Sequence, residues 1–269
     1  PCPEAGCSLA ESCDAGEFAA FKAKYPGHTV VSYVNTTVGV KALTDICCTS
    51  SNALKVVESI PADQPVIFAP DRNLGSYIQK LTGRRNMVLW DGACHVHEEF
   101  SLEKLLTLKL EHPAAKVVVH PECRAYIVEV ADYVGSTAGI LEYCGRSDAQ
   151  EFIVVTEAGI LAEMKRRYPE KEFIPAPPDD ETCGCNDCKY MKMVTKTALA
   201  ASIRRLVTTL FRTPITFRFS IRAAASIPSN TMLTPSILQA STALQTRARS
   251  SAILQETART QPSTRRRVR

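Results

Sequence analysis

The chain has 269 residues, of which 45% are hydrophobic, and its formal net charge is +4 at pH 7. This length allows one large domain or two to three small ones. The longest apolar runs, such as residues 66–69, have the length of a strand and fall far short of the roughly 20 residues that span a bilayer, which predicts no membrane-spanning segment. Eleven cysteines are present, but no stretch combines the features of a secretory signal, so we expect a cytoplasmic protein rather than a disulfide scaffold.

The charge is divided unevenly along the chain. Residues 199–269 hold 12 arginines and one acidic residue, Glu256, which gives +11. Residues 1–198 hold 20 basic and 27 acidic residues, which gives −7, together with every cysteine and glycine. An arginine-rich tail can bind nucleic acid or anionic lipid by counterion release. The simultaneous loss of Gly, Cys, Lys and Asp favours the alternative, a disordered tail read from a wrong frame or an unspliced intron, so nucleic-acid binding is not expected.

The elements predicted in chain order form a repeat. The first unit runs from Cys7 through a helix at 17–25, a strand at 29–34, a polar segment at 44–51 and strands at 66–69 and 86–90. The second runs from Cys94 through a helix at 102–111, a strand at 116–120, a polar segment at 131–138 and strands at 152–156 and 172–175, and it ends at Cys188.

The spacing between equivalent positions is nearly constant. Cys7 and Cys94 are 87 residues apart, as are Tyr33 and His120, and Ser50 and Ser136 are 86 apart. Apolar strands that alternate with helices indicate parallel sheets with helices on both faces. We therefore predict an α/β fold built from small three-layer units in a pseudo-threefold repeat, with two of three units present.

This repeat predicts four segments. Residues 1–15 would be the remnant of an earlier unit, because Cys7 stands where a unit ends. Residues 16–98 and 99–193 would be the two α/β units. Residues 194–269 would form the disordered basic tail.

Ligands of parallel sheets bind beyond the carboxyl ends of the strands. Polar residues follow those strands here: Tyr33, Asn35 and Ser50 in the first unit, and His120, Glu122, Ser136 and Thr137 in the second. They would suit an anionic ligand and include an acid and base pair. The alternative is that they are turn or cap residues, with Ser136 and Thr137 capping a helix. Likewise, Asp71, Arg72 and Asn73 could bind ligand or form a tight turn that opens the next helix.

The cysteines allow two interpretations. Cys183, Cys185 and Cys188 form a Cys-x-Cys-x-x-Cys cluster, and soft thiolates favour zinc, copper(I) or iron–sulfur binding. Free cysteine is also among the most buried residue types. We expect that structural burial for Cys2, Cys13, Cys47, Cys48, Cys123 and Cys144, whereas the repeat marks Cys7, Cys94 and Cys188 as unit-boundary residues.

Eight motifs resemble the quinolinate synthase family. They are Glu-Ala-Gly-Cys-Ser-Leu-Ala at 4–10, Tyr-Val-Asn at 33–35, Cys-Thr-Ser-Ser-Asn-Ala at 48–53, Pro-Asp-Arg-Asn-Leu-Gly at 70–75, Gly-Ala-Cys-His-Val-His at 92–97, His-Pro-Glu-Cys at 120–123, Ala-Asp-Tyr-Val-Gly-Ser-Thr at 131–137 and Cys-Lys-Tyr-Met-Lys-Met at 188–193. The resemblance covers residues 1 to about 193. It departs where the family begins with a further unit, and after Met193, where the family continues with a helix.

The resemblance implies a central 4Fe-4S cluster bound by Cys7, Cys94 and Cys188, one from each unit. It implies the condensation of iminoaspartate with dihydroxyacetone phosphate to quinolinate for NAD synthesis, with L-aspartate oxidase as the partner that supplies the imine. Carried over to this chain, Tyr33, His120 and Glu122 would be catalytic, and Asn35, Ser50, Ser136 and Thr137 would complete the substrate site. Without the first unit, we expect weak or no turnover.

Two rival functions belong to other classes. One is a structural zinc or iron–sulfur module that uses Cys183, Cys185 and Cys188. The other is a nucleic-acid-binding protein that uses the basic tail.

Overall fold

The computed structural model describes residues 5–179 and 186–212, which form two parallel four-stranded sheets. The first sheet has the order β2-β1-β3-β4 and the second β6-β5-β7-β8. The strands are β1 (Thr29–Tyr33), β2 (Ile46–Cys48), β3 (Val66–Ala69), β4 (Met87–Leu89), β5 (Lys116–Val119), β6 (Tyr133–Val134), β7 (Glu151–Val155) and β8 (Glu172–Pro175). The predicted parallel α/β architecture is confirmed.

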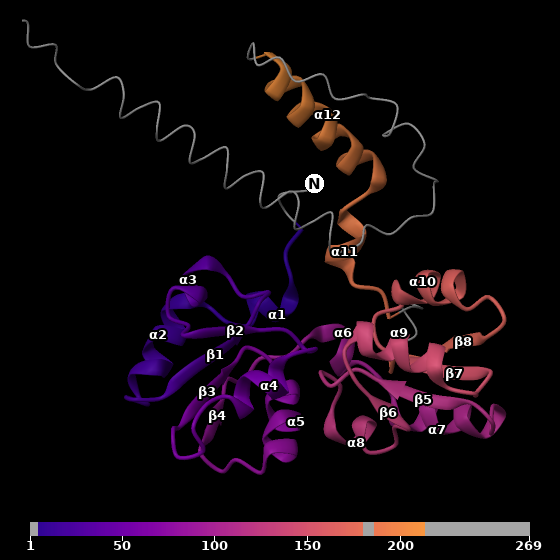
Figure 1. The fold of residues 1–269 in the computed structure, drawn as a ribbon, viewed down its shortest axis with the longest axis horizontal. Coiled ribbons are helices and arrows are strands. Elements are labelled where there is room, and N and C mark those ends of the chain that lie inside the picture. Colours follow the sequence, from indigo (N-terminus) through magenta and orange to yellow (C-terminus); the bar gives the residue numbers. More distant parts are fainter. Residues whose placement is uncertain (1–4, 180–185, 213–269) are drawn as a thin grey trace, which may run out of the picture. The chain divides into compact units, whose positions relative to one another are not determined.

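Helices connect the strands in the same pattern in both halves (Figure 1). The first half contains α1 (Ser8–Glu11), α2 (Ala15–Ala23), α3 (Val38–Lys41), α4 (Ala53–Glu58) and α5 (Arg72–Thr82). The second contains α6 (His95–Glu98), α7 (Leu102–Glu111), α8 (Ala125–Val128), α9 (Thr137–Arg146) and α10 (Ile160–Arg167), and α11 (Lys189–Met193) and α12 (Lys196–Arg212) follow it.

The two sheets share one register, which supports the repeat at the level of single residue pairs. Thr29 of β1 pairs with Val66 of β3, and Lys116 of β5 pairs with Phe152 of β7. These pairs are displaced from each other by 87 and 86 residues, the spacings that the cysteines and serines show in the sequence. Because the pairing register is the same in both sheets, equivalent strands end at equivalent positions within their own sheets.

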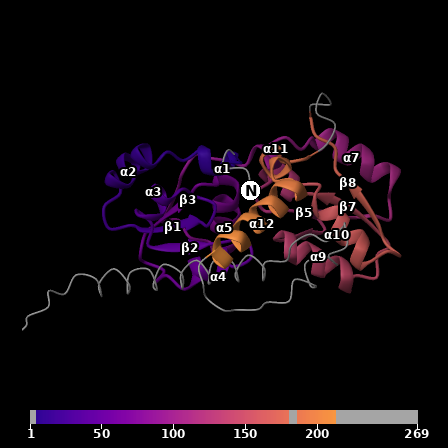
Figure 2. The same cartoon turned by 90° about the horizontal axis from the view of Figure 1, so that it is seen from above.

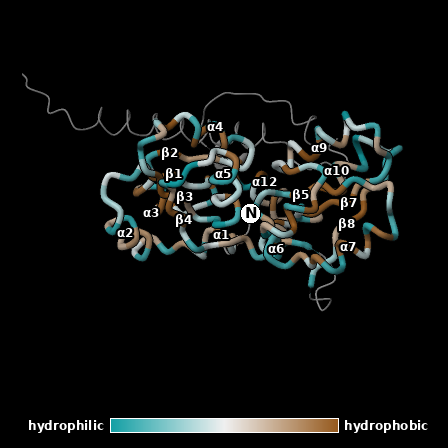
Figure 3. The backbone as a smooth tube through the Cα atoms, turned by 90° about the horizontal axis from the view of Figure 1, so that it is seen from below, coloured by the Kyte–Doolittle hydropathy of each residue, from teal (hydrophilic) through white to brown (hydrophobic). Residues whose placement is uncertain are grey.

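Each sheet is buried on both faces because neighbouring residues of a strand point to opposite sides. Val31 of β1 packs with α4 and α5, whereas Val30 packs with α2 and α3. In the second sheet, Val118 of β5 packs with α9 and α10, whereas Val117 packs with α7 and α8. Figure 2 shows α7 and α10 on opposite sides of the second sheet. Figure 3 shows hydrophobic brown segments along β7 and β8.

The segment that follows the second sheet differs from its prediction. Residues 196–212 form the helix α12, although a disordered tail was predicted from residue 194 onward. The rest of that predicted tail lies outside the described residues. Within residues 5–179 and 186–212, no helix has the length and apolar content needed to cross a membrane.

Candidate active site and metal centre

Polar residues from the two repeats meet at the carboxyl ends of β1, β2 and β5. His120 directly follows β5, and its Nε2 lies 3.3 Å from Ser50 Oγ, two residues beyond β2. Tyr33 is the last residue of β1, and the interaction with its side chain contributes to lowering the pKa of Glu122. The structure therefore brings together four of the residues predicted from the strand ends.

The structure adds His97, which the sequence reasoning did not select. This residue of α6 is buried, and its ring stacks on His120 with a centroid distance of 4.6 Å and an interplanar angle of 20°. Its Nε2 lies 3.1 Å from Thr156 Oγ1 and its Nδ1 lies 3.2 Å from Glu122 Oε2. The Cys-x-x-His spacing from Cys94 was a usable signal, because residues three apart share one face of a helix.

We call Tyr33, Ser50, His97, His120 and Glu122 the buried polar cluster. Glu122 and His97 form its charged pair. Burial would raise the pKa of the Glu122 carboxyl, but the hydrogen bond from His97 and the charges of His120 and His97 lower it overall. Burial would lower the pKa of His97, but hydrogen bonds to Cys94 and Glu122 raise it to about 10. At neutral pH, Glu122 is therefore an anion and His97 a cation.

The other two titratable members of the cluster stay neutral. Burial and the charge of His97 lower the pKa of His120 to about 3. Its Nδ1 accepts the Glu122 N–H at 3.3 Å, so its Nε2 carries the hydrogen that points to Ser50 Oγ. Burial, together with the charge of Glu122, raises the pKa of Tyr33. His120 Nε2 thus donates to the Ser50 hydroxyl, and Ser50 and Glu122 both influence the pKa of Tyr33.

The three cysteines marked by the repeat share one local structure. Cys7, Cys94 and Cys188 each precede a short helix as its N-cap residue, at α1, α6 and α11, with an extended backbone. All three are half-buried, and in the described parts of these caps no thiol forms a capping hydrogen bond. Each sulfur is therefore left available to another ligand. We call these residues the cysteine triad.

Contacts beside the cysteines bring the three turns together, since Ser8 Oγ lies 2.6 Å from His95 Nδ1 and the His95 ring lies 6.4 Å from the Tyr190 ring. Burial chiefly raises the pKa of Cys7, and the charge of Cys94 adds to the rise. The hydrogen bond to Glu11 chiefly raises the pKa of Tyr190, and the charges of Cys188 and Cys7 contribute. Cys94 thus acts on Cys7, and Cys7 and Cys188 both act on Tyr190.

The donor set fits an iron–sulfur cluster. Each of the three soft thiol ligands stands at a helix N-terminus. Such ligands bind iron–sulfur clusters better than they bind hard cations. Cys94 also belongs to a second possible metal group, since one ligand atom each from Cys94, His97 and Glu122 lie within 4.8 Å of one another. His97 Nδ1 lies 3.2 Å from Glu122 Oε2 without a hydrogen bond of good geometry among the described residues, and it would bind a metal only after losing its proton.

The remaining predicted substrate residues have other contacts. Asn35 is exposed, and its Nδ2 lies 3.9 Å from Cys7 Sγ. Ser136 is the N-cap of α9, and its Oγ accepts the Gly139 N–H at 3.2 Å. Thr137 is exposed at the first position of that helix. Ser136 thus adopts the capping role that the sequence left open, and within the described residues no hydrogen bond or ion pair joins it or Thr137 to the buried polar cluster.

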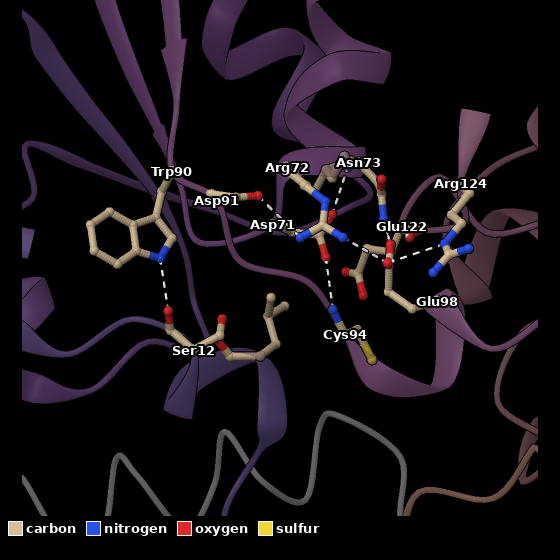
Figure 4. A network of polar contacts seen from close by, with 12 residues as sticks. Ser12, Asp71, Arg72, Asn73, Trp90, Asp91, Cys94, Glu98, Glu122 and Arg124 are labelled. Atoms are coloured by element: carbon tan, nitrogen blue, oxygen red, sulfur yellow. Dashed lines mark hydrogen bonds and ion pairs between the residues drawn. The ribbon is translucent and has the colours of Figure 1, made fainter.

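The segment after β3 opens α5 and also reaches the second repeat (Figure 4). Asp71 is buried and caps α5 through Leu74. Arg72 forms ion pairs with Asp91 at 3.2 Å and Glu98 at 2.7 Å. Asn73 Nδ2 donates to Glu98 Oε1 and to the Glu122 carbonyl, the latter at 3.0 Å. The predicted turn is present, and the Asn73 side chain holds the backbone of Glu122.

Most of the cysteines that we expected to be structural are buried. They are Cys13, Cys48, Cys123 and Cys144. Cys47 differs, because it is exposed in the middle of β2, an outer strand of its sheet. Cys2, Cys183 and Cys185 lie outside the described residues.

Comparison with known proteins gives one family. A family model described as "Quinolinate synthetase A protein" matches residues 1–234. The quinolinate synthase of Thermosynechococcus vestitus is 55% identical over 200 residues, which cover 74% of this chain and 62% of the relative. The quinolinate synthase of Trichormus variabilis is 51% identical over 230 residues, covering 85% and 68%. That of Chloroherpeton thalassium is 49% identical over 231 residues, covering 86% and 70%.

These matches show how much of a relative the chain spans and how far along the chain the family similarity continues. The chain spans only about three fifths of the first relative, with 62% covered. The family match also continues to residue 234, well beyond residue 193, where the motif resemblance stopped. With the family model matching most of its length and relatives about half identical to it, this chain belongs to the quinolinate synthetase A family.

Proposed function

We propose that this chain carries the catalytic centre of a quinolinate synthase, which condenses iminoaspartate with dihydroxyacetone phosphate. The observation that carries the proposal is the adjacency of two groups. Cys94 of the cysteine triad contacts His97, and His97 contacts Glu122 of the buried polar cluster. A metal centre held by the triad would thus adjoin the buried ion pair of His97 and Glu122.

The triad would hold a 4Fe-4S cluster through Cys7, Cys94 and Cys188. When bound, such a cluster with one iron free of protein ligands would supply Lewis acidity toward a substrate oxygen or nitrogen. The transferase class and the dependence on iron and sulfur belong to this proposal.

The buried polar cluster supplies the proton transfers. A condensation that loses phosphate and water needs a base for protons on carbon and acids for the departing oxygens. Glu122 is the ionised carboxylate and serves as the base. The cationic His97 can donate from Nδ1, and the Tyr33 hydroxyl can move a proton between substrate and Glu122. His120 has too low a pKa to serve as the acid in this resting state, so we assign it an orienting hydrogen bond from Nε2.

The outer residues would hold the anionic ends of the substrates. Ser50 remains a hydrogen-bond donor next to Tyr33, and Asn35 lies at the exposed side. Ser136 and Thr137 begin the ten-residue helix α9, and a helix N-terminus favours a phosphate or carboxylate group. The cytoplasmic location, the supply of imine by L-aspartate oxidase and the weak turnover of this chain stay predictions.

Anaerobic reconstitution with iron and sulfide tests the metal centre without requiring turnover. The wild-type chain should gain the broad visible absorbance of an iron–sulfur cluster, and serine substitution of Cys7, Cys94 or Cys188 should abolish it. The matched control is Cys47→Ser, since Cys47 is exposed and outside the triad. Zinc uptake that requires His97 and Glu122 but neither Cys7 nor Cys188 would instead support the second metal group and refute the proposal.

A further inference from the structure

Two carboxylates accept hydrogen bonds from the backbone N–H groups of two members of the cysteine triad, Cys94 and Cys188. We propose that Asp71 and Glu157 are positioning residues that fix the Cys94 and Cys188 turns in the geometry that receives the cluster. This inference deepens the proposed function and rests on its metal centre.

Asp71 joins the start of α5 to the Cys94 turn. Its side chain is buried, Oδ1 accepts the Leu74 N–H at 2.7 Å, and Oδ2 accepts the Cys94 N–H at 3.2 Å (Figure 4). One carboxylate thus fixes both the helix that follows β3 and the cysteine that follows β4.

Glu157 makes comparable bonds in the second repeat, 86 residues later. Its Oε2 accepts the Gly159 N–H at 2.8 Å, and its Oε1 accepts the Cys188 N–H at 3.3 Å. The first bond differs, since Asp71 caps α5 three residues ahead whereas Glu157 bonds the N-cap residue of α10 two residues ahead. The second bond, to the N–H of a triad cysteine, recurs with the repeat although a different side chain makes it.

A backbone hydrogen bond accompanies each carboxylate. The Arg72 N–H donates to the Gly92 carbonyl at 2.8 Å, and the Ala158 N–H donates to the Asn186 carbonyl at 3.0 Å. Both acceptors stand two residues before a triad cysteine. A Cβ atom on Gly92 would lie 2.5 Å from the Pro70 carbonyl oxygen, so this turn packs directly on the segment after β3.

These contacts hold the backbone of Cys94 and Cys188 without using their thiols. The N-cap positions of α6 and α11 are extended, and within the described structure their cysteine side chains make no capping hydrogen bond. The cysteine N–H groups bond to Asp71 and Glu157 instead, which orients the turns while each sulfur stays open to iron. Residues that orient metal ligands in this way commonly control metal affinity.

The chain contains a matched pair of carboxylates for comparison. Asp45 Oδ2 accepts the Val30 N–H and Asp132 Oδ2 accepts the Val117 N–H, both at 2.8 Å. They also recur with the repeat, but they bond near the amino ends of β1 and β5, at the opposite edges of the sheets. Substituting them disturbs the same kind of bond away from the cysteines.

The test uses Asp71→Ala and Glu157→Ala, with Asp71→Asn, Glu157→Gln, Asp45→Asn and Asp132→Asn beside them. Circular dichroism first selects variants that fold. In the metal-free chain, thiol alkylation followed by mass spectrometry should show faster modification of Cys94 in Asp71→Ala and of Cys188 in Glu157→Ala, each without the other. A general loss of packing would raise both rates, so the selectivity distinguishes positioning from a structural role.

After anaerobic reconstitution, the two alanine variants should lose iron to a chelator about 10-fold faster than wild type. Asp71→Asn and Glu157→Gln keep one carbonyl acceptor and should recover part of that loss, and the Asp45 and Asp132 variants should match wild type. Unchanged alkylation and iron retention in folded alanine variants would overturn the inference. Failure of the wild-type chain to bind any cluster would instead refute the proposed function, while the alkylation result would still stand.

Discussion

At the scale of single residues, the buried pair of His97 and Glu122 dominates the site. Their side chains are 8% and 5% exposed, and Nδ1 and Oε2 are 3.2 Å apart. Removing one member of such a pair leaves an uncompensated charge in a poorly solvated place. The pair is therefore expected to matter for stability as well as for proton transfer.

We predict that His97→Gln lowers the free energy of unfolding by about 3 kcal/mol. Urea unfolding of the metal-free chain measures this. The control is Lys80→Ala, which breaks an exposed ion pair with Glu129 at 3.7 Å and should cost less than about 1 kcal/mol. Equal losses in the two variants would contradict the assignment of a charged buried pair.

His120 gives the site a pH dependence with a definite sign. Its folded pKa is about 3, whereas an unfolded histidine titrates near about 6.5. Between these values the unfolded chain binds more protons, so acidification favours unfolding.

Relative to His120→Asn, the wild-type chain should lose about 1 kcal/mol of stability between pH 7 and about pH 5.5. Urea unfolding of both proteins at the two pH values isolates this difference, because His97 and the carboxylates are common to both. His28→Asn removes a histidine outside the site and should not reproduce the effect. A difference that stays constant with pH would show that His120 is not held neutral.

At the scale of secondary-structure elements, Glu98 connects three helix ends. It ends α6, it pairs with Arg72 at the start of α5, and it pairs with Arg124, the N-cap of α8, at 3.2 Å. Its side chain is only 14% exposed, although both arginines are about two-fifths exposed. These bonds join the first repeat to the second beside Glu122.

We predict that Glu98→Ala costs about 1–2 kcal/mol in unfolding free energy, after discounting for the solvent access of the arginines. The matched control is Glu163→Ala, which removes two ion pairs with Arg166 and Arg167 within one helix and should cost about 0.5 kcal/mol. Chemical denaturation compares them. A cost for Glu98 no larger than that for Glu163 would mean that the link between repeats contributes little.

At the scale of the whole molecule, the sequence repeat was sufficient to predict the fold. The near-constant spacing of 86 to 87 residues related the predicted strand positions in one unit to those in the other. Strands β3 and β8 and helix α7 occupy the predicted residues. Parallel pairing followed from the alternation of apolar strands and helices. Helix α12 was missed, because the change in composition after residue 198 outweighed the helix-forming sequence around it.

The site was predicted only in part, because strand ends indicate an edge but give no distances along it. Tyr33, Ser50, His120 and Glu122 do meet, because the carboxyl ends of β1 and β2 lie beside that of β5. His97 was missed because it lies on a short helix after a strand end, where only its spacing from Cys94 marked it. The local role of Ser136 as a cap shows that a polar residue at a strand end can serve the backbone first.

The proposed binding of one 4Fe-4S cluster by Cys7, Cys94 and Cys188 together can be measured by native mass spectrometry of the anaerobically reconstituted chain. We expect a mass increase equal to one such cluster in the wild type and in Cys47→Ser, and no increase when any one triad cysteine is replaced by serine. A cluster that persists without Cys7 or without Cys188, or a single zinc ion in its place, would contradict it.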